Sequence, residues 1–193
     1  MRMRAVPALS IAAMLAGACA TPGAVEREVV RTIALRNPGF EELAAPRPCP
    51  VGWDCTMHND PKSFRFFLDE VAPAAGRASL CIEPAGKEPW GIASQGVFEI
   101  AALRGARVRF SAAIRVEGVT GDGAGPYISA HGATLARDAV LVKGTQGWRR
   151  IAVEIEVPAG APFIELGVTL EGRGRVCLDD ALLEVVHVPK RPV

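Results

Sequence analysis

This sequence has no excess of positive or of negative charge. Its 193 residues include 22 lysines and arginines against 21 aspartates and glutamates, which gives a net charge of +1. The chain therefore lacks the overall basic field that attracts nucleic acid, and the acidic excess that attracts a cationic partner. The composition is otherwise ordinary for a globular domain, with 49% apolar and 22% charged residues. Any partner must be selected by local features.

Signatures of catalysis are missing as well. The sequence contains no Walker, Rossmann or zinc-protease pattern. Ser94 misses the Gly-x-Ser-x-Gly elbow at its first glycine, and His131 is near Ser129 and Asp138 only along the chain, which implies no triad geometry. A zinc site is disfavoured, because there is no Cys-x-x-Cys and no histidine at ligand spacing to a cysteine. We expect a protein that is not an enzyme, and an undetected hydrolase is the last alternative.

Helical periodicity is also lacking. Alternating apolar and polar runs instead recur about every 8 to 12 residues, with turn signals between them. The clearest alternation lies in 105–116, and 151–157, 164–170 and 175–186 show it again, while the glycine-rich segment 118–126 is expected to be a loop. Each run has one face to bury and therefore needs an opposing sheet. The pattern predicts an all-β fold, a two-sheet antiparallel β-sandwich over residues 29–188, followed by a tail at 189–193.

Residues 1–18 have the pattern of a secretory signal peptide. Two arginines precede the small apolar run 5–16, which is too short to span a bilayer, and Cys19 follows a set of small residues. This order resembles a bacterial lipobox, in which the cysteine becomes the lipidated first residue, although Ala16 stands where leucine is usual. Lipidation would tether the protein through 19–28 to the outer membrane, because no aspartate follows the cysteine. Ordinary cleavage at the Ala-x-Ala pattern, giving a soluble periplasmic or secreted protein, is the alternative.

Four cysteines remain if Cys19 carries lipid. An even number of cysteines in an exported chain indicates disulfides. Three pairings are possible, and we favour Cys49 with Cys55, which closes a small loop, and Cys81 with Cys177. Free buried thiols are the alternative.

The motifs of the chain follow one another as in a known family. In order they are Asn37-Pro38-Gly39-Phe40-Glu41, Gly52-Trp53, 78–82, Ser94-Gln95, 103–111, Gly147-Trp148, Val157-Pro158 and 174–180. This arrangement resembles the bacterial carbohydrate-binding modules of the galactose-binding-like jelly-roll superfamily, of the type found on cellulases and xylanases. The resemblance covers about residues 33–186 and implies a jelly roll. Function does not follow from such a fold, because these modules have sugar-binding, peptide-binding and purely structural roles.

The resemblance also implies one structural calcium ion where the first and last strands meet. Glu41 would supply one carboxylate, and Asp179 or Asp180 another, since carboxylates and backbone carbonyls suit this hard cation. The alternative is that these acids accept hydrogen bonds from loop amides without an ion. No other cofactor is expected.

Side chains that could recognise a sugar are few, with aromatic residues at 6% of the chain and a single tyrosine. We take Tyr127 and Trp90 as candidate ligand-binding residues, and rings that serve only as core and loop anchors are the alternative. Arg107, Arg109 and Arg115 share a strand face and could pair with an acidic sugar or a lipopolysaccharide phosphate. Glutamates across the sheet would explain these arginines equally well.

The sequence thus predicts a non-catalytic binding or accessory module of the cell envelope, with polysaccharide or another glycan as the first ligand class. The membrane would be reached through Cys19, and no nucleic-acid partner is expected. The alternative is a structural or protein-interaction sandwich without a sugar site. An exposed row of aromatic rings on a concave sheet would favour glycan binding, and a flat polar sheet with an apolar rim would favour the alternative.

Membrane attachment is tested by changing the lipobox cysteine. Cys19→Ala should move the protein from the membrane fraction to the soluble fraction, or leave its signal peptide uncleaved, because the acceptor of the lipid is gone. Fractionation with an immunoblot measures both outcomes. A processed Cys19→Ala protein that stays in the membrane fraction would rule out lipidation at this residue.

Overall fold

The computed structural model describes residues 29–42, 49–132 and 135–187. Cys19, the signal-like segment and the tail at 189–193 lie outside these ranges. The strands are β1 (Arg31–Ile33), β2 (Asp54–Met57), β3 (Phe64–Asp69), β4 (Ser79–Pro84), β5 (Trp90–Val97), β6 (Arg107–His131), β7 (Ala136–Ala139), β8 (Val142–Glu156) and β9 (Phe163–His187), with one 3-10 turn, η1 (Ala101–Leu103). Their pairings are all antiparallel, which confirms the expected fold class. Within the described ranges, no helix has the length and apolarity to cross a bilayer.

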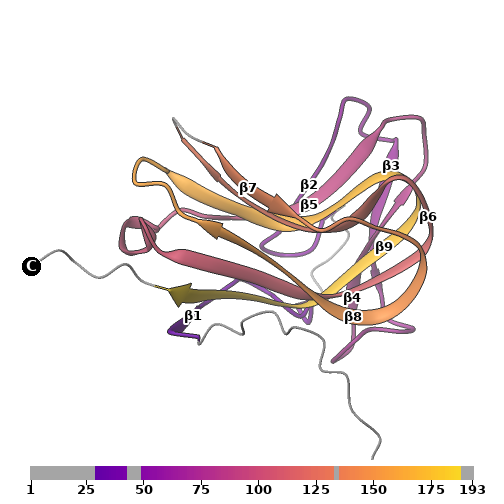
Figure 1. Cartoon of the computed structure of the whole chain (residues 1–193). Helices are drawn as coiled ribbons and strands as arrows, with labels where there is room; N and C mark the ends of the chain where they lie inside the picture. Colours follow the sequence, from indigo (N-terminus) through magenta and orange to yellow (C-terminus); the bar gives the residue numbers. More distant parts are fainter. Residues whose placement is uncertain (1–28, 43–48, 133–134, 188–193) are drawn as a thin grey trace, which may run out of the picture.

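Two long strands, β6 and β9, build the architecture together. Each has 25 residues, and they pair along almost their whole length while curving around one side of the molecule (Figure 1). The sequence predicted a loop at 118–126, but β6 runs through it. Glycines explain the difference, because they allow the backbone to bend without ending the ladder. Gly121 of β6 has φ +79°, and a Cβ there would collide with the carbonyl oxygen of Glu171 on β9.

The bend divides the pairing into two packed layers. In one layer the order is β2, β5, residues 163–171 of β9, residues 123–131 of β6, and β7. In the other the order is β3, β4, the second half of β9, the first half of β6, and β8, with β1 added beside the end of β9. Inward side chains of both layers form one core, which includes the fully buried Phe110, Ile114, Leu166, Leu170 and Leu178. Burial of these apolar surfaces is the main force that holds the layers together.

Two disulfides reinforce the sandwich, and both have the expected pairing. Cys49 bonds to Cys55 and ties the segment before β2 to that strand. Cys81 of β4 bonds to Cys177, its direct partner on β9, and both side chains are buried. The second bond links residues 96 apart in sequence, and chain-entropy models give such a loop about 4–5 kcal/mol of stabilisation.

Candidate ligand-binding face

The outward side of the β2-β5-β9-β6-β7 layer is the candidate site, and we call it the Tyr127 face. Because side chains alternate along a strand, the inward Leu166 and Val168 leave Glu165, Gly167 and Thr169 on the outer side of β9. Gly167 lies between Ser94 of β5 and Tyr127 of β6 in the pairing register. The central strand, β9, therefore has no side chain at the middle of the face. This leaves a depression between Ser94 and Tyr127.

A hollow of about 140 Å³ lies beside Tyr127 on this face. Its lining residues come from β5, β6, β7 and β9 and from the residue just before β7: Ile92, Tyr127, Ser129, His131, Leu135, Arg137 and Glu165. The Tyr127 residue is only 4% exposed, and its hydroxyl has no hydrogen-bond partner among the described residues. Ser94 and Glu165 are close enough for weak hydrogen-bonding interactions with the phenol that affect its pKa, but neither meets the strict geometry of a hydrogen bond with it.

The environment of Tyr127 keeps its hydroxyl protonated. Burial raises the pKa of the phenol above its ordinary value, and the negative charge of Glu165 raises it further. The guanidinium of Arg137, 5.8 Å from the ring centroid, opposes this shift. A neutral buried hydroxyl without a partner costs free energy in the free protein, so a ligand oxygen that accepts its hydrogen bond would remove that cost.

Polar groups surround the hollow without forming catalytic machinery. Nε2 of His131 lies 3.1 Å from Oγ of Ser129 and 3.3 Å from Oε2 of Glu165. In a Ser-His-acid triad the two ring nitrogens serve different partners, whereas here one nitrogen faces both. Asp138, the other acid near this histidine in sequence, accepts a hydrogen bond from the backbone N–H of Glu154 instead. The cluster can hold hydroxyl groups, and it has no activated nucleophile.

Aromatic rings form a row at one end of the Tyr127 face. Phe98, which is 71% exposed, lies 5.5 Å from Phe163, and that ring stacks on His131 at 4.9 Å. At the other end Trp90 meets His58 edge-on at 5.9 Å. Sequence reasoning missed Phe98 and Phe163, because they stand at strand ends and only the register of β5, β6 and β9 brings them together. The exposed ring of Phe98 in this row supplies an apolar surface on which a sugar ring can stack.

The three arginines that the sequence proposed for binding lie on the opposite outer side, over the other layer. Arg107 and Arg109 of β6 face their direct partners Glu156 and Glu154 of β8 at 3.9 and 2.9 Å. Arg115 pairs with Asp69 at 2.5 Å. The fold thus brings Tyr127 and Trp90 to one face and separates the arginines from them. Their contacts are those of the alternative interpretation, in which acidic residues across the sheet neutralise them.

Known proteins resemble this chain in structure and not in sequence. No protein-family profile matches it, and no curated protein is significantly similar to it. The CBM22-1 xylan-binding domain of Paenibacillus barcinonensis Xyn10C superposes with a TM-score of 0.56 at 14% identity, over 86% of this chain and all of that domain. TmCBM61 in complex with β-1,4-galactotriose gives 0.53 at 19% identity, over 77% of this chain and 95% of the other. The fold is a jelly roll. Identity this low establishes the fold alone.

A further similar structure is a putative sugar binding protein from Bacteroides thetaiotaomicron. It superposes with a TM-score of 0.51 at 10% identity, over 81% of this chain and 95% of the other. The three structures thus share the jelly-roll fold of this chain. What each of them binds is a property of that protein.

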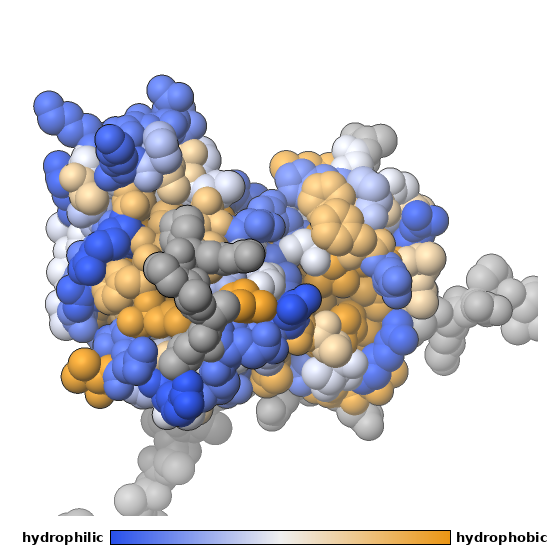
Figure 2. All heavy atoms as spheres, turned by 180° about the vertical axis from the view of Figure 1, so that it is seen from behind, coloured by the Kyte–Doolittle hydropathy of each residue, from blue (hydrophilic) through white to orange (hydrophobic). Residues whose placement is uncertain are grey.

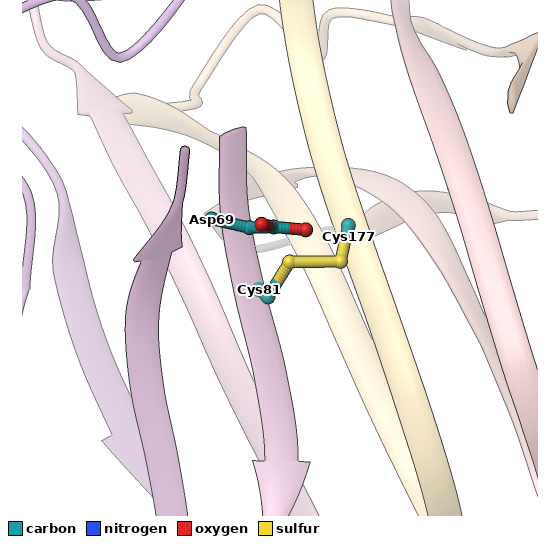
Figure 3. A group of neighbouring side chains, drawn as sticks. All are labelled: Asp69, Cys81 and Cys177. Carbon is teal, nitrogen blue, oxygen red and sulfur yellow. A yellow bond between two sulfur atoms is a disulfide. The ribbon is translucent and has the colours of Figure 1, made fainter. Parts of the chain in front are cut away.

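A second cluster of potential ligand atoms lies on the arginine side of this jelly roll. A carboxylate oxygen of Asp69 and the sulfurs of Cys81 and Cys177 lie within 4.8 Å of one another (Figure 3). The sulfurs are bonded to each other, so they offer no thiolate to a metal. A hydrogen bond from the N–H of Val71 and the charge of Arg115 lower the pKa of Asp69. Its charge is therefore already balanced, and the cluster is a structural ion pair over the disulfide.

Two of the acids proposed for calcium, Glu41 and Asp179, contact one loop, residues 72–77. Asp179 is fully buried, and its Oδ2 accepts hydrogen bonds from the N–H groups of Ala74 and Ala75 at 2.9 and 3.0 Å. Glu41 accepts one from the N–H of Arg77 at 2.8 Å. Burial raises the pKa of Asp179, and the amide hydrogen bonds oppose that shift.

Asp180 is turned away from this loop, and its carboxylate pairs with Arg150. Among the described residues, none of the three acids belongs to a group of close potential ligand atoms. In this geometry the donor set does not fit a cation, because loop N–H groups rather than carbonyl oxygens point at the carboxylates. The contacts are those of the loop-amide alternative, and calcium binding stays a prediction that would require the loop peptides to turn.

Melting in calcium and in chelator tests that prediction. If Glu41 and Asp179 share an ion in the native state, calcium should raise the Tm. At a free calcium concentration 100 times the Kd, the free energy of unfolding should increase by about 2.7 kcal/mol. Glu41→Gln should abolish most of this response and leave the fold intact, because the domain has its own core. Identical melting curves in calcium and in chelator, for protein shown to be metal-free at the start, would leave the acids as acceptors for the loop.

Proposed function

We propose that this chain is a non-catalytic carbohydrate-binding module that binds a glycan on the Tyr127 face. The observation that carries the proposal is the buried, unpartnered hydroxyl of Tyr127, which lies beside a hollow lined by polar groups. A row of aromatic rings stands next to that hollow. Stacking surfaces with nearby hydrogen-bonding groups are the usual means of holding a sugar. The named ligands of the similar jelly rolls, xylan and β-1,4-galactotriose, support the same ligand class.

Each part of the face has a distinct role in this proposal. The hydroxyl of Tyr127 is shielded from solvent in the free protein, so binding requires the side chains beside it to shift and expose it, after which it donates a hydrogen bond to a sugar oxygen. The carboxylate of Glu165 accepts a hydrogen bond from a sugar hydroxyl. Arg137, whose side chain is 52% exposed and whose nearest acid is Glu171 at 4.0 Å, donates from the rim. Phe98 and Phe163 hold the adjoining ring of the glycan by stacking.

We place the protein in the cell envelope, beyond the inner membrane. Two disulfides in the described residues favour an exported protein, since such bonds persist in oxidising compartments. The lipobox-like cysteine, Cys19, supports attachment to the outer membrane. An anchored module of this kind would hold polysaccharide at the cell surface or in the periplasm.

Removal of one oxygen atom tests the site most cleanly. Tyr127→Phe should lower glycan affinity about 3- to 10-fold, because one neutral hydrogen bond contributes about 0.5–1.5 kcal/mol. The same change should leave the Tm unchanged or raise it, since the deleted hydroxyl has no partner in the free protein. A glycan array that includes xylo-oligosaccharides and β-1,4-galactotriose finds the ligand, and calorimetry then compares the variants.

Two further variants complete the design. Phe98→Ala should weaken binding by loss of stacking, and Val71→Ala is the matched control, because Val71 is a 94% exposed apolar side chain in the loop after β3 of the other layer. Equal affinity of wild type, Tyr127→Phe and Phe98→Ala for a bound glycan would place the site elsewhere. A folded protein that binds no glycan would favour the structural or protein-interaction alternative.

A further inference from the structure

An apolar pocket opens at the edge of the sandwich where β2 and β3 end the two layers. The inward side chains of these edge strands, Met57 of β2 and Phe64 and Phe66 of β3, face the gap between the layers. The pocket has a volume of about 380 Å³. Its full lining is Cys55, Met57, Pro61, Lys62, Phe64, Arg65, Phe66 and Ala85. None of these residues belongs to the Tyr127 face.

The lining combines apolar walls with a cationic rim. Phe64 and Phe66 are members of the hydrophobic core, so the pocket is a continuation of the core toward solvent. Its volume lies within the roughly 300–1,000 Å³ of small-molecule sites.

Two cationic side chains reach the pocket, and they differ in how they are neutralised. The guanidinium of Arg65 is already paired with Glu83 and lies 4.2 Å over the ring of Phe67 on the outer side of β3. Lys62 is exposed, and within the described ranges its ammonium group has no carboxylate at ion-pair distance. The nearby Asp60 uses its two oxygens to accept from the backbone N–H of Lys62 and from the hydroxyl of Ser63. The rim therefore offers one unpaired positive charge.

We propose that this pocket binds the hydrocarbon chain of a single-chain anionic amphiphile, a fatty acid, with the carboxylate at the ammonium group of Lys62. The chain lies between β2 and β3 against Met57, Phe64 and Phe66, and the head group stays at the solvent-exposed rim. We infer this ligand from the charge and apolarity of the pocket. An apolar pocket with one unpaired cation at its mouth is complementary to a long apolar tail with one anion at its end. This site acts independently of the glycan face, and neither proposal depends on the other.

A series of saturated fatty acids of increasing chain length tests the size of the pocket. Calorimetry on the purified protein, below the micelle concentration of each acid, should show one-to-one binding. Affinity should rise about fourfold for each added CH₂ group, since each buried group contributes about 0.8 kcal/mol, and should level off when the pocket is full. An affinity that rises without levelling, or the absence of saturable binding up to dodecanoate, would overturn the proposal.

Variants then locate the site. Lys62→Glu should weaken dodecanoate binding at least about tenfold, by replacing attraction with repulsion, and Lys62→Arg should preserve it. Lys143→Glu on β8 is the control for the charge change, because Lys143 is also an exposed lysine but does not line the pocket. Ala85→Trp should fill the pocket and so prevent binding of the hydrocarbon chain. An unchanged Tm would show that this variant is folded. Equal affinities in Lys62→Glu and Lys143→Glu, or undiminished binding to folded Ala85→Trp, would contradict the assignment.

Discussion

The continuous pairing of β6 with β9 is the constraint on which the rest of this structure depends. These two strands run through both layers, so their register decides which side chains are inward and which are outward in each. A slip of one residue would exchange the core with the surface along both strands. The same register places Gly167 between Ser94 and Tyr127, and so creates the depression in the candidate site. The site is therefore a direct product of how the sandwich is closed.

The two outer sides of the sandwich differ in how their polar groups are satisfied. On the arginine side, Arg109 pairs with Glu154, and Arg175 bridges Glu83 and Glu117, so these charges have an opposite charge beside them. In the same layer Oγ of Ser79 and Nε of Arg115 are buried without a hydrogen bond among the described residues. On the Tyr127 face a buried hydroxyl has no partner, and rings are exposed at the strand ends. Arginines that already face carboxylates gain little from a ligand, whereas the exposed rings beside the Tyr127 hollow offer a sugar a stacking surface that the free protein leaves uncovered. The surface seen from behind mixes hydrophobic and hydrophilic residues, with an indentation between two bulging parts (Figure 2).

Much of the fold was predictable from the sequence, and the site was predictable only in part. Alternation predicts strands because it is a local property, and an even number of cysteines in an exported chain led to the correct pairs, Cys49 with Cys55 and Cys81 with Cys177. The continuity of β6 was not predicted, because glycines that usually end strands instead bend this one. Tyr127 was identified as a candidate, but Glu165, which lines the same hollow, and Phe163, which stacks on His131, come from β9, and only the three-dimensional register brings them to this face.

The central claim is that a glycan binds on the Tyr127 face, and backbone amide NMR with a bound oligosaccharide tests it most directly. Titration with a glycan selected by array should shift the amide signals of residues 91–97, 125–131 and 163–169, which form the strands of that face. The signals of β3, β4 and β8 on the opposite layer should stay unchanged. Shifts concentrated on the arginine side, around Arg109 and Arg115, would contradict the account and return the binding role to the charged face.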